Sequence, residues 1–320
     1  MPTGIWTTDQ IDTRMLYKEF IVGVEQYNEA EWGIISKFVR STTKEANKIW
    51  QRNMEFIYGS QGYLTDMQRP DVLEISIGLE SFNLGYGFTK DALEDSTANE
   101  LKETQGEALR ADQRLLAKRF FYRALTPGVS GTSRGFWDAF QLKAPPTHKG
   151  NTFTTSHVHY YVTGSATLAL ADINTLKKTI REHGYAGELY LFINSGMVEK
   201  FENLAGWTSA MTPNTVIETV ATLGFKAVKK FQEFTIVEDD WVPDGYLFGV
   251  EGTIKPVAMR EPLNPQAKGL RLFKGPYEEY PLLEAYYQRR FDMEAVHRGA
   301  GAVAQVTAGA WADPTFAFNL

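Results

Sequence analysis

The longest helical pattern in the chain runs from Thr89 to Leu125. Within it, apolar side chains recur every seven or eight residues and form one stripe of a helix with 3.6 residues per turn. The stripe consists of Leu93, Leu101, Ala108, Leu109, Leu115, Leu116 and Tyr122. The opposite face carries Glu94, Lys102, Glu103, Glu107, Arg110, Arg114 and Lys118. The pattern predicts one long helix, with Thr89 as its N-cap and Pro127 beyond its end.

A single helix of this length has a consequence for the shape of the molecule. At about 1.5 Å per residue it spans roughly 54 Å, which is too long for the interior of one compact domain. An extended subunit that meets neighbours is therefore expected. Gly106 is the weak point, because glycine costs about 1 kcal/mol relative to alanine inside a helix. Arg119 and Arg123 fall in the last turn, where positive charge suits the helix dipole.

The chain before this helix divides into two patterns. Residues 13–27 are amphipathic, with Met15, Leu16, Phe20 and Val24 on one face, and we interpret residues 1–31 as an N-terminal arm that needs a partner. Polar and apolar residues then alternate over 49–56 and 71–79, on either side of a glycine-containing break. This predicts an extended β-loop over residues 32–88, with little core of its own.

Beyond the long helix, strand and helix patterns alternate. Strands are expected at 157–162, 188–194, 234–237 and 246–250, and helices at 171–183, 197–204 and from Pro213. These predict an inserted α/β domain over residues 166–250. Two later strand-like runs, 283–291 and 302–307, would return to the long helix and complete a domain made of residues 89–165 and 251–320. The predicted fold class is α+β.

Composition narrows the classes of function. The 320 residues are 43% hydrophobic, which is enough for one large or two medium cores. A net charge of -6 disfavours a protein that binds nucleic acid by neutralising phosphates. The absence of cysteine excludes disulfides, thiolate zinc sites and cysteine nucleophiles. No run approaches the roughly 20 apolar residues that cross a bilayer, and the first residues lack a signal-peptide pattern. We expect an intracellular protein that does not enter membranes.

His157 and His159 are the sharpest candidates for metal ligands. Residues two apart on a strand point to the same face, a geometry that zinc can use. The sequence shows no third histidine or carboxylate near them, so a polar strand face is the preferred interpretation. We accordingly expect no metal site and no cofactor, and a metal-dependent hydrolase using these two histidines is kept as an alternative.

Two further segments are weighed as sites. Residues 84–90, LGYGFTK, precede a helix as a phosphate-binding loop does, but they lack its GK[ST] ending, so a hinge for the β-loop is preferred. The acidic run 238–240 lies beside a Pro-Asp-Gly turn, which predicts a solvated turn rather than a pair of catalytic carboxylates. With no G-x-S-x-G motif either, the chain is not expected to be an enzyme.

The order of the expected elements is an arm, a β-loop, a long helix, an inserted α/β domain and returning strands. This order resembles the major capsid protein of tailed bacteriophages, whose Hong-Kong-phage-type fold is shared with encapsulins. Two local segments carry the same resemblance. Residues 88–96, FTKDALEDS, look like the junction of β-loop and helix; residues 238–248, EDDWVPDGYLF, followed by 255–258, KPVA, look like the closure of the inserted domain.

The resemblance implies a function. The subunit would assemble as hexamers and pentamers into an icosahedral shell that encloses packaged double-stranded DNA without sequence-specific binding. It would be found in a virion capsid assembled in the host cytoplasm, with scaffolding, portal and decoration proteins as further partners. An encapsulin-type compartment is the alternative. The acidic balance suits a shell wall that must not condense its contents. Because no long charged helical segment precedes the β-loop, any scaffolding is expected to be a separate protein.

Some members of this family join subunits covalently, through a lysine of the β-loop and an asparagine of a neighbour. Here no lysine occurs from Ile49 to Phe88. We therefore expect noncovalent contacts, in which apolar burial contributes about 25 cal/mol per Å² and exposed salt links about 1 kcal/mol or less. The candidate contact residues are Trp50, Arg52, Met54, Phe56, Tyr58, Tyr63, Leu64 and Arg69.

Overall fold

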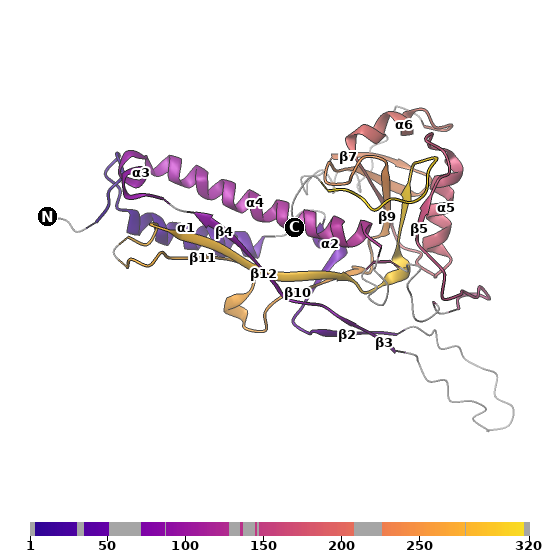
Figure 1. Cartoon of the computed structure of the whole chain (residues 1–320), viewed down its shortest axis with the longest axis horizontal. Coiled ribbons are helices and arrows are strands. Elements are labelled where there is room, and N and C mark those ends of the chain that lie inside the picture. The colour runs from indigo at the N-terminus through magenta and orange to yellow at the C-terminus, as the bar shows by residue number, and fades with distance from the viewer. Residues whose placement is uncertain are drawn as a thin grey trace, which may run out of the picture.

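A computed structural model describes residues 4–30, 35–50, 72–86, 88–127, 135–136, 145, 147–207, 226–278 and 280–316. The molecule is elongated (Figure 1). The longest helix and the longest strand run beside each other along its axis, and a second sheet with its own helices lies at one end. Among the described residues, none of the helices combines the length and apolar character needed to cross a bilayer.

The long helical pattern folds as two helices instead of one. Helix α3 spans Lys90–Asp95 and α4 spans Ala98–Leu125. Between them, the Thr97 hydroxyl accepts a hydrogen bond from the Glu100 backbone N–H, and the Glu100 carboxylate accepts one from the Thr97 backbone N–H. This capping box starts a new helix, and its T-x-x-E signature was overlooked in the sequence. Helix α4 continues through Gly106, so the expected weak point does not interrupt it.

The two predicted faces of α3 and α4 are confirmed. Leu93, Leu101, Ala108 and Leu116 are buried, and Leu109, Leu115 and Tyr122 are partly buried. The charged face is exposed, apart from Lys118, which is partly buried. The buried face also holds four polar residues that the sequence pattern did not place there: Gln105, Asp112, Arg119 and Arg123. The arginines were assigned to the helix dipole, but they make buried ion pairs.

The first sheet lies along α4 and is organised around one strand, β12. Its strands are β1 (Val39–Thr42), β4 (Glu80–Tyr86), β10 (Val257–Arg260), β11 (Leu270–Phe273) and β12 (Ala285–Ala295). Strand β12 pairs antiparallel with β4, β11 and β10, and β1 joins β10 in parallel. Short segments flank these strands: α2 (Ile35–Phe38), and the 3₁₀ turns η2 (Pro265–Ala267) and η3 (Arg298–Ala300).

The second sheet has six strands in the order β5-β13-β9-β6-β8-β7. They are β5 (Tyr160–Val162), β6 (Leu189–Ile193), β7 (Lys226–Phe231), β8 (Phe234–Glu238), β9 (Tyr246–Glu251) and β13 (Gly301–Gln305). Every residue of β6 and β9 is buried, as their continuous apolar runs predict. Helix α5 (Leu170–Arg181) covers one face, and η1 (Ser195–Met197) leads into α6 (Val198–Glu202). The expected helix from Pro213 lies outside the described residues.

This sheet departs from two predictions. Strand β5 begins only at Tyr160, so His157 and His159 precede it instead of forming its face. The sheet also crosses the predicted domain boundaries at 165 and 251, because β5 and β13 come from outside residues 166–250. Strand β5 pairs in parallel with β13, which lies about 140 residues later in the chain. The sequence near residue 166 gives no sign of this pairing, so the domain boundary was placed after β5.

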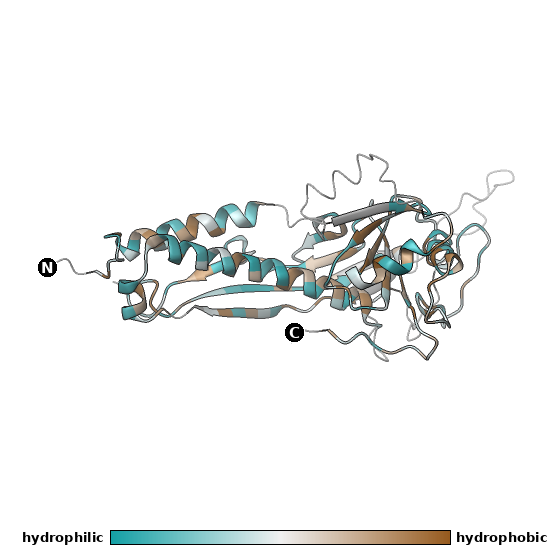
Figure 2. Cartoon of the chain, turned by 90° about the horizontal axis from the view of Figure 1, so that it is seen from above, coloured by the Kyte–Doolittle hydropathy of each residue, from teal (hydrophilic) through white to brown (hydrophobic). Residues whose placement is uncertain are grey.

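Two apolar cores hold these layers together. One lies between the end of α4 and both sheets and includes Phe120, Phe121, Phe192, Phe248 and Met293. The other lies between α5 and the opposite face of the six-stranded sheet. Figure 2 shows the hydrophobic strands gathered in the half that holds this sheet, whereas the long helices are mostly hydrophilic on their outer side. Since the first core contains residues of both sheets, the two halves pack as one body.

Helix α1 (Thr13–Glu29) corrects the interpretation of residues 1–31. Leu16, Phe20 and Val24 are buried, as predicted, but Met15 is 61% exposed. The buried face packs against the same chain: the Gln105 side-chain amide donates to the Phe20 carbonyl, and α1 also contacts β11. The expectation of an arm that needs a partner therefore fails for this helix, whose stripe is covered by its own α4.

Candidate assembly surfaces and a histidine cluster

The predicted β-loop is described only at its root. Strands β2 (Ala46–Trp50) and β3 (Val72–Ser76) pair antiparallel, with Trp50 opposite Val72. The pair leaves the body of the molecule in Figure 1. The backbone of Trp50 is thus placed, whereas Arg52, Met54, Phe56, Tyr58, Tyr63, Leu64 and Arg69 lie outside the described residues. Within the predicted range 32–88, β1 and β4 belong to the first sheet, and of the described strands in this range only β2 and β3 leave the body.

Backbone and ionic contacts fix this root to the first sheet. The Ile77 N–H donates to the Glu45 carbonyl at 2.9 Å, and the Arg260 guanidinium donates to the Ile77 carbonyl at 2.7 Å. Arg260 also lies 3.3 Å from the Glu45 carboxylate. Because Ile77 and Ile75 are buried with Ala258, the strand pair leaves the body at a defined angle.

Exposed apolar side chains mark further surfaces. Leu263 is 79% exposed beside η2, and Tyr277 is 54% exposed in the connection between β11 and β12. Val22 on α1 and Leu84 on β4 are also exposed. Apolar side chains that are exposed singly are common on soluble proteins, so only a neighbouring chain that covers them would make them contact residues. Sequence reasoning missed them, because a single apolar residue in a proline-rich turn has no period.

A buried ion network joins the end of α4 to the first sheet. Asp292 of β12 accepts hydrogen bonds from Arg119 at 2.9 Å and from Arg123 at 2.9 and 3.2 Å. The same arginines reach the partly exposed Glu80 of β4, with Arg119 at 2.6 Å. Asp292 and both arginines are at most 5% exposed. Buried charges of this kind persist only when paired, so these contacts fix the helix against two strands.

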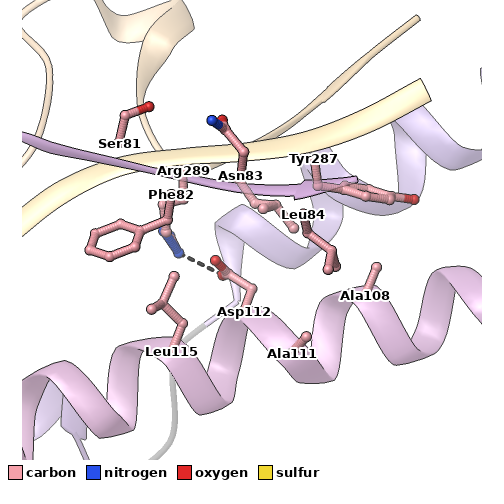
Figure 3. Close-up of a pocket in the computed structure, with 11 residues that line it drawn as sticks. Ser81, Phe82, Asn83, Leu84, Ala108, Ala111, Asp112, Leu115, Tyr287 and Arg289 are labelled. Atoms are coloured by element: carbon pink, nitrogen blue, oxygen red, sulfur yellow. Dashed lines mark hydrogen bonds and ion pairs between the residues drawn. The ribbon is translucent and has the colours of Figure 1, made fainter. Parts of the chain in front are cut away.

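A second buried pair lies further along α4, at the floor of the hollow shown in Figure 3. Asp112 accepts hydrogen bonds from Arg289 and from the Tyr27 hydroxyl, both at 2.8 Å. Burial, and then the neighbouring Asp112 carboxylate, raise the pKa of Tyr27, which keeps the phenol protonated as a donor. The hollow, about 350 Å³, is otherwise lined mainly by apolar side chains of α4 and β4.

Three histidines and one carboxylate meet at the end of α5. The Nε2 atom of His183 lies 2.9 Å from Nε2 of His159 and 3.0 Å from Nε2 of His157. The Glu182 carboxylate lies 3.3 Å from Nε2 of His157. One ligand atom from each of the four residues fits within a 4.8 Å span. The sequence prediction that no third histidine or carboxylate accompanies His157 and His159 is therefore wrong.

Local structure explains why these side chains converge. Helix α5 ends at Arg181, with Glu182 as its C-cap, and His183 follows in the turn. Gly184 has φ +90°, a conformation that glycine adopts without strain, and a Cβ there would lie 2.6 Å from the His148 ring. The His159 ring is fully buried, and its Nδ1–H donates to the Gly301 carbonyl at the start of β13. The Phe153 ring stacks on His183 with centroids 4.3 Å apart.

Burial sets the protonation of this cluster. It lowers the pKa of His159 well below the ordinary value and that of His183 to about 3. It also lowers the pKa of His157, and it raises that of Glu182 against the opposing effect of Lys178. The three imidazoles are thus neutral at neutral pH, with nitrogen lone pairs available.

The structure also describes parts of the two other candidate segments, residues 84–90 and 238–240. Residues 84–86 are ladder positions of β4, paired with residues 285–287 of β12, so they do not form a phosphate-binding loop. In the acidic run, Asp240 is exposed, but Asp239 is buried and burial raises its pKa to about 6. The expected solvated turn is therefore wrong for Asp239, whose backbone N–H donates to the Ile193 carbonyl at the end of β6.

Comparison with known proteins identifies the architecture. No family model and no curated protein matches the chain. Among solved structures, it is similar to a chain of Mycobacterium phage Patience, with 23% identity and a TM-score of 0.70 over 97% of this chain and 93% of that chain. The chain has the Hong-Kong-phage-type capsid fold.

Two more distant structures share this capsid fold. The capsid of a native GTA particle is 12% identical, with a TM-score of 0.56 over 87% of this chain and 91% of that one. The capsid of cyanophage A-1(L) is 13% identical, with a TM-score of 0.55 over 87% of this chain and 93% of that one. The fold resemblance stated from the sequence is thereby confirmed. In the capsid fold, α4 is the expected spine helix and β2–β3 are the root of the expected β-loop.

Proposed function

We propose that this chain is a major capsid protein that self-assembles into an icosahedral shell enclosing packaged double-stranded DNA. The observation that carries the proposal is the whole-length likeness to a phage chain, since 97% of this chain and 93% of that chain superpose. A capsid subunit works through its outer surfaces, so similarity that extends over the full elongated shape bears on assembly as well as on folding. The role is structural and not catalytic.

Three surface features support assembly as hexamers and pentamers. The strand pair β2–β3 leaves the body, which supports contact with a neighbour. Leu263 and Tyr277 expose apolar area at separate places on the described surface. In the first sheet, β1 and β11 are the end strands of the order β1-β10-β12-β11, so each has a strand edge that a neighbour could pair with. A subunit with several such surfaces suits a closed shell better than a simple dimer.

We further propose that the β-loop supplies the main contact residues, namely Trp50, Arg52, Met54, Phe56, Tyr58, Tyr63, Leu64 and Arg69. In functional terms, we propose residues 166–250 as an axial domain and residues 89–165 and 251–320 as a peripheral domain, except that β5 and β13 of the flanking ranges join the axial sheet. The net charge of -6 supports a wall that contains DNA without binding its sequence. Assembly in the host cytoplasm, with separate scaffolding, portal and decoration proteins, completes the proposal.

The test is to purify the full chain and examine it by size-exclusion chromatography and negative-stain electron microscopy. Shells, rings or capsomers are expected. A globular monomer at every concentration would sink the proposal. Particles from the native host should contain nuclease-protected DNA, whereas particles that hold an enzyme and no DNA would favour an encapsulin-type compartment.

The linkage between subunits has its own test. Because the chain lacks lysine from Ile49 to Phe88, mature particles boiled in detergent should give a single band near 36.1 kDa. A ladder of linked oligomers would refute noncovalent assembly. Mass spectrometry of the same particles tests the separate scaffold, which loss of a large N-terminal fragment would contradict.

A further inference from the structure

The cluster of His157, His159, Glu182 and His183 poses a hydrogen-bonding problem. The His159 Nδ1–H donates to the Gly301 carbonyl, so Nε2 of this neutral ring carries a lone pair. The 2.9 Å contact then requires a proton on Nε2 of His183. Consequently, Nε2 of His157, 3.0 Å away, must be an acceptor too. Yet an oxygen of Glu182 lies 3.3 Å from that same atom, so an ionised Glu182 would face a lone pair and not a donor.

No arrangement of protons on neutral rings therefore satisfies all three contacts while Glu182 is ionised. A cation at the centre resolves the conflict, because it accepts the lone pairs of all four groups at once. We propose that these four side chains form a zinc site, with Nε2 of each histidine and one Glu182 oxygen as ligands.

The geometry suits tetrahedral zinc. With zinc–nitrogen bonds of about 2.0–2.1 Å, tetrahedral ligand atoms lie about 3.3–3.4 Å apart. Three of the six separations are 2.9, 3.0 and 3.3 Å and the others are at most 4.8 Å, so the ion requires side-chain movements that draw the more distant ligand atoms together. The bond from His159 Nδ1–H to the Gly301 carbonyl is the outer hydrogen bond that orients a histidine ligand.

The chemistry of the ligands selects the metal class. Three imidazole nitrogens and one carboxylate favour zinc over magnesium and calcium, which prefer oxygen. The chain has no cysteine, so nitrogen and oxygen are its only strong ligands for zinc. Three of its five histidines lie in this one cluster.

Four protein ligands fill a tetrahedral sphere, which is the pattern of a structural site and not of a catalytic one. The ion would tie the end of α5 to the segment before β5, and through Gly301 to the start of β13. It would therefore hold the edge of the six-stranded sheet where β5 pairs with β13. This role does not support the alternative of a metal-dependent hydrolase.

The experiment uses the unassembled full-length chain, stripped with chelator and dialysed against zinc, with bound metal measured by mass spectrometry. His148→Gln is the matched control, since this ring packs near the cluster but is not among the four ligands. Wild type and the control should bind one zinc per chain. His183→Gln and His157→Gln should bind at least about 10-fold more weakly, because even loss of an outer partner costs that much.

Two further readouts sharpen the result. Cobalt in place of zinc should give the intense visible absorption of a tetrahedral site in wild type and not in His157→Gln. Zinc should raise the unfolding midpoint of wild type and of the control only, by preferential binding to the folded state. His157→Gln serves if His183→Gln fails to fold, because the His157 side chain is 20% exposed.

Absence of zinc from the dialysed wild type would overturn the proposal. Full zinc binding by His157→Gln, or loss of zinc in the His148→Gln control, would overturn the assignment of ligands. All three results are read on single subunits, so they are independent of whether the chain forms shells.

Discussion

The two sheets of this molecule are held by different forces. Strands β6 and β9 of the six-stranded sheet are buried at every position and, apart from Glu251 at the end of β9, pack through apolar and aromatic side chains. Strand β12 is equally central to the first sheet, but it carries buried Arg289, Asp292 and Glu294. Apolar contacts tolerate the loss of a partner gradually, whereas a buried charge left without its partner is strongly destabilising. The spine region should therefore respond to single charge changes far more than the second sheet.

The largest expected effect follows from removing the carboxylate at the centre of the ion network. Asp292→Ala leaves Arg119 and Arg123 buried with the partly exposed Glu80 and, for Arg123, the more distant Glu294 at 3.9 Å, and should lower the free energy of unfolding by about 3–5 kcal/mol. Urea unfolding of the unassembled subunit measures it.

Glu80→Gln is the matched control, because this carboxylate touches the same arginines but is 46% exposed. Its effect should stay below about 1 kcal/mol, as for other exposed ion pairs. Equal losses in the two variants would mean that burial does not decide the strength of this network.

The half with the six-stranded sheet also contains a buried carboxylate that has no ion-pair partner in the described part of the chain, and removal of its charge is expected to stabilise the fold. Asp239 is buried, its Oδ2 has no hydrogen-bond partner among the described residues, and burial raises its pKa to about 6. An acid whose pKa is raised by folding binds its proton more tightly when folded, so its contribution weakens stability as pH rises from about 4 to 6.

Asp239→Asn should remove this loss while keeping an oxygen for the Trp241 N–H. The variant should equal wild type at about pH 4 and exceed it by up to about 3 kcal/mol at pH 7. Unfolding curves at both pH values check this. A variant less stable than wild type at pH 7 would show that the ionised carboxylate is stabilising.

A smaller effect is expected from the β-loop. Replacing Trp50 or Tyr63 by alanine should lower shell stability by about 2 kcal/mol or more per contact, as aromatic anchors at interfaces do, with a smaller loss in the isolated subunit. Thermal disruption of shells, compared with unfolding of subunits, makes the measurement. Equal losses in both would mean that the loop packs on its own subunit.

The smallest effect concerns the break between α3 and α4. Thr97→Ala removes the hydroxyl that caps α4 and should cost about 1 kcal/mol. Thr97→Ser keeps the cap and is the control. If both variants match wild type in urea unfolding, the capping box does not determine where α4 begins.

The sequence predicted those parts of the fold that have a local period. The stripe of α4, the strands β6 and β9, and the helix α5 were found because burial follows a repeat of 3.6 or a continuous apolar run. Strands β10 and β11 were missed, since four residues give too little pattern. Asp112 and Arg123 were not assigned to the core, because a charged residue on a helix normally faces solvent. Here each is buried because it pairs with a residue of β12 that is distant in sequence.

The histidine cluster was missed for a related reason. His157 and His159 are adjacent in sequence, but Glu182 and His183 come from the far end of another helix. Spacing carries no information about such a meeting, because the packing of α5 on β13 brings them together. A signal did exist: a helix that ends in Glu-His-Gly, in a chain with five histidines, places two potential ligands beside a glycine turn.

The placement of β12 and β13 has a consequence for the timing of synthesis. Strand β12 is the strand to which β4, β10 and β11 all pair, and β13 lies between β5 and β9. Both are made after residue 284, so neither sheet can close before that part of the chain has emerged from the ribosome. Pairings between residues so distant in sequence form slowly. A nascent chain that stops short of β12 and β13 therefore cannot complete either sheet.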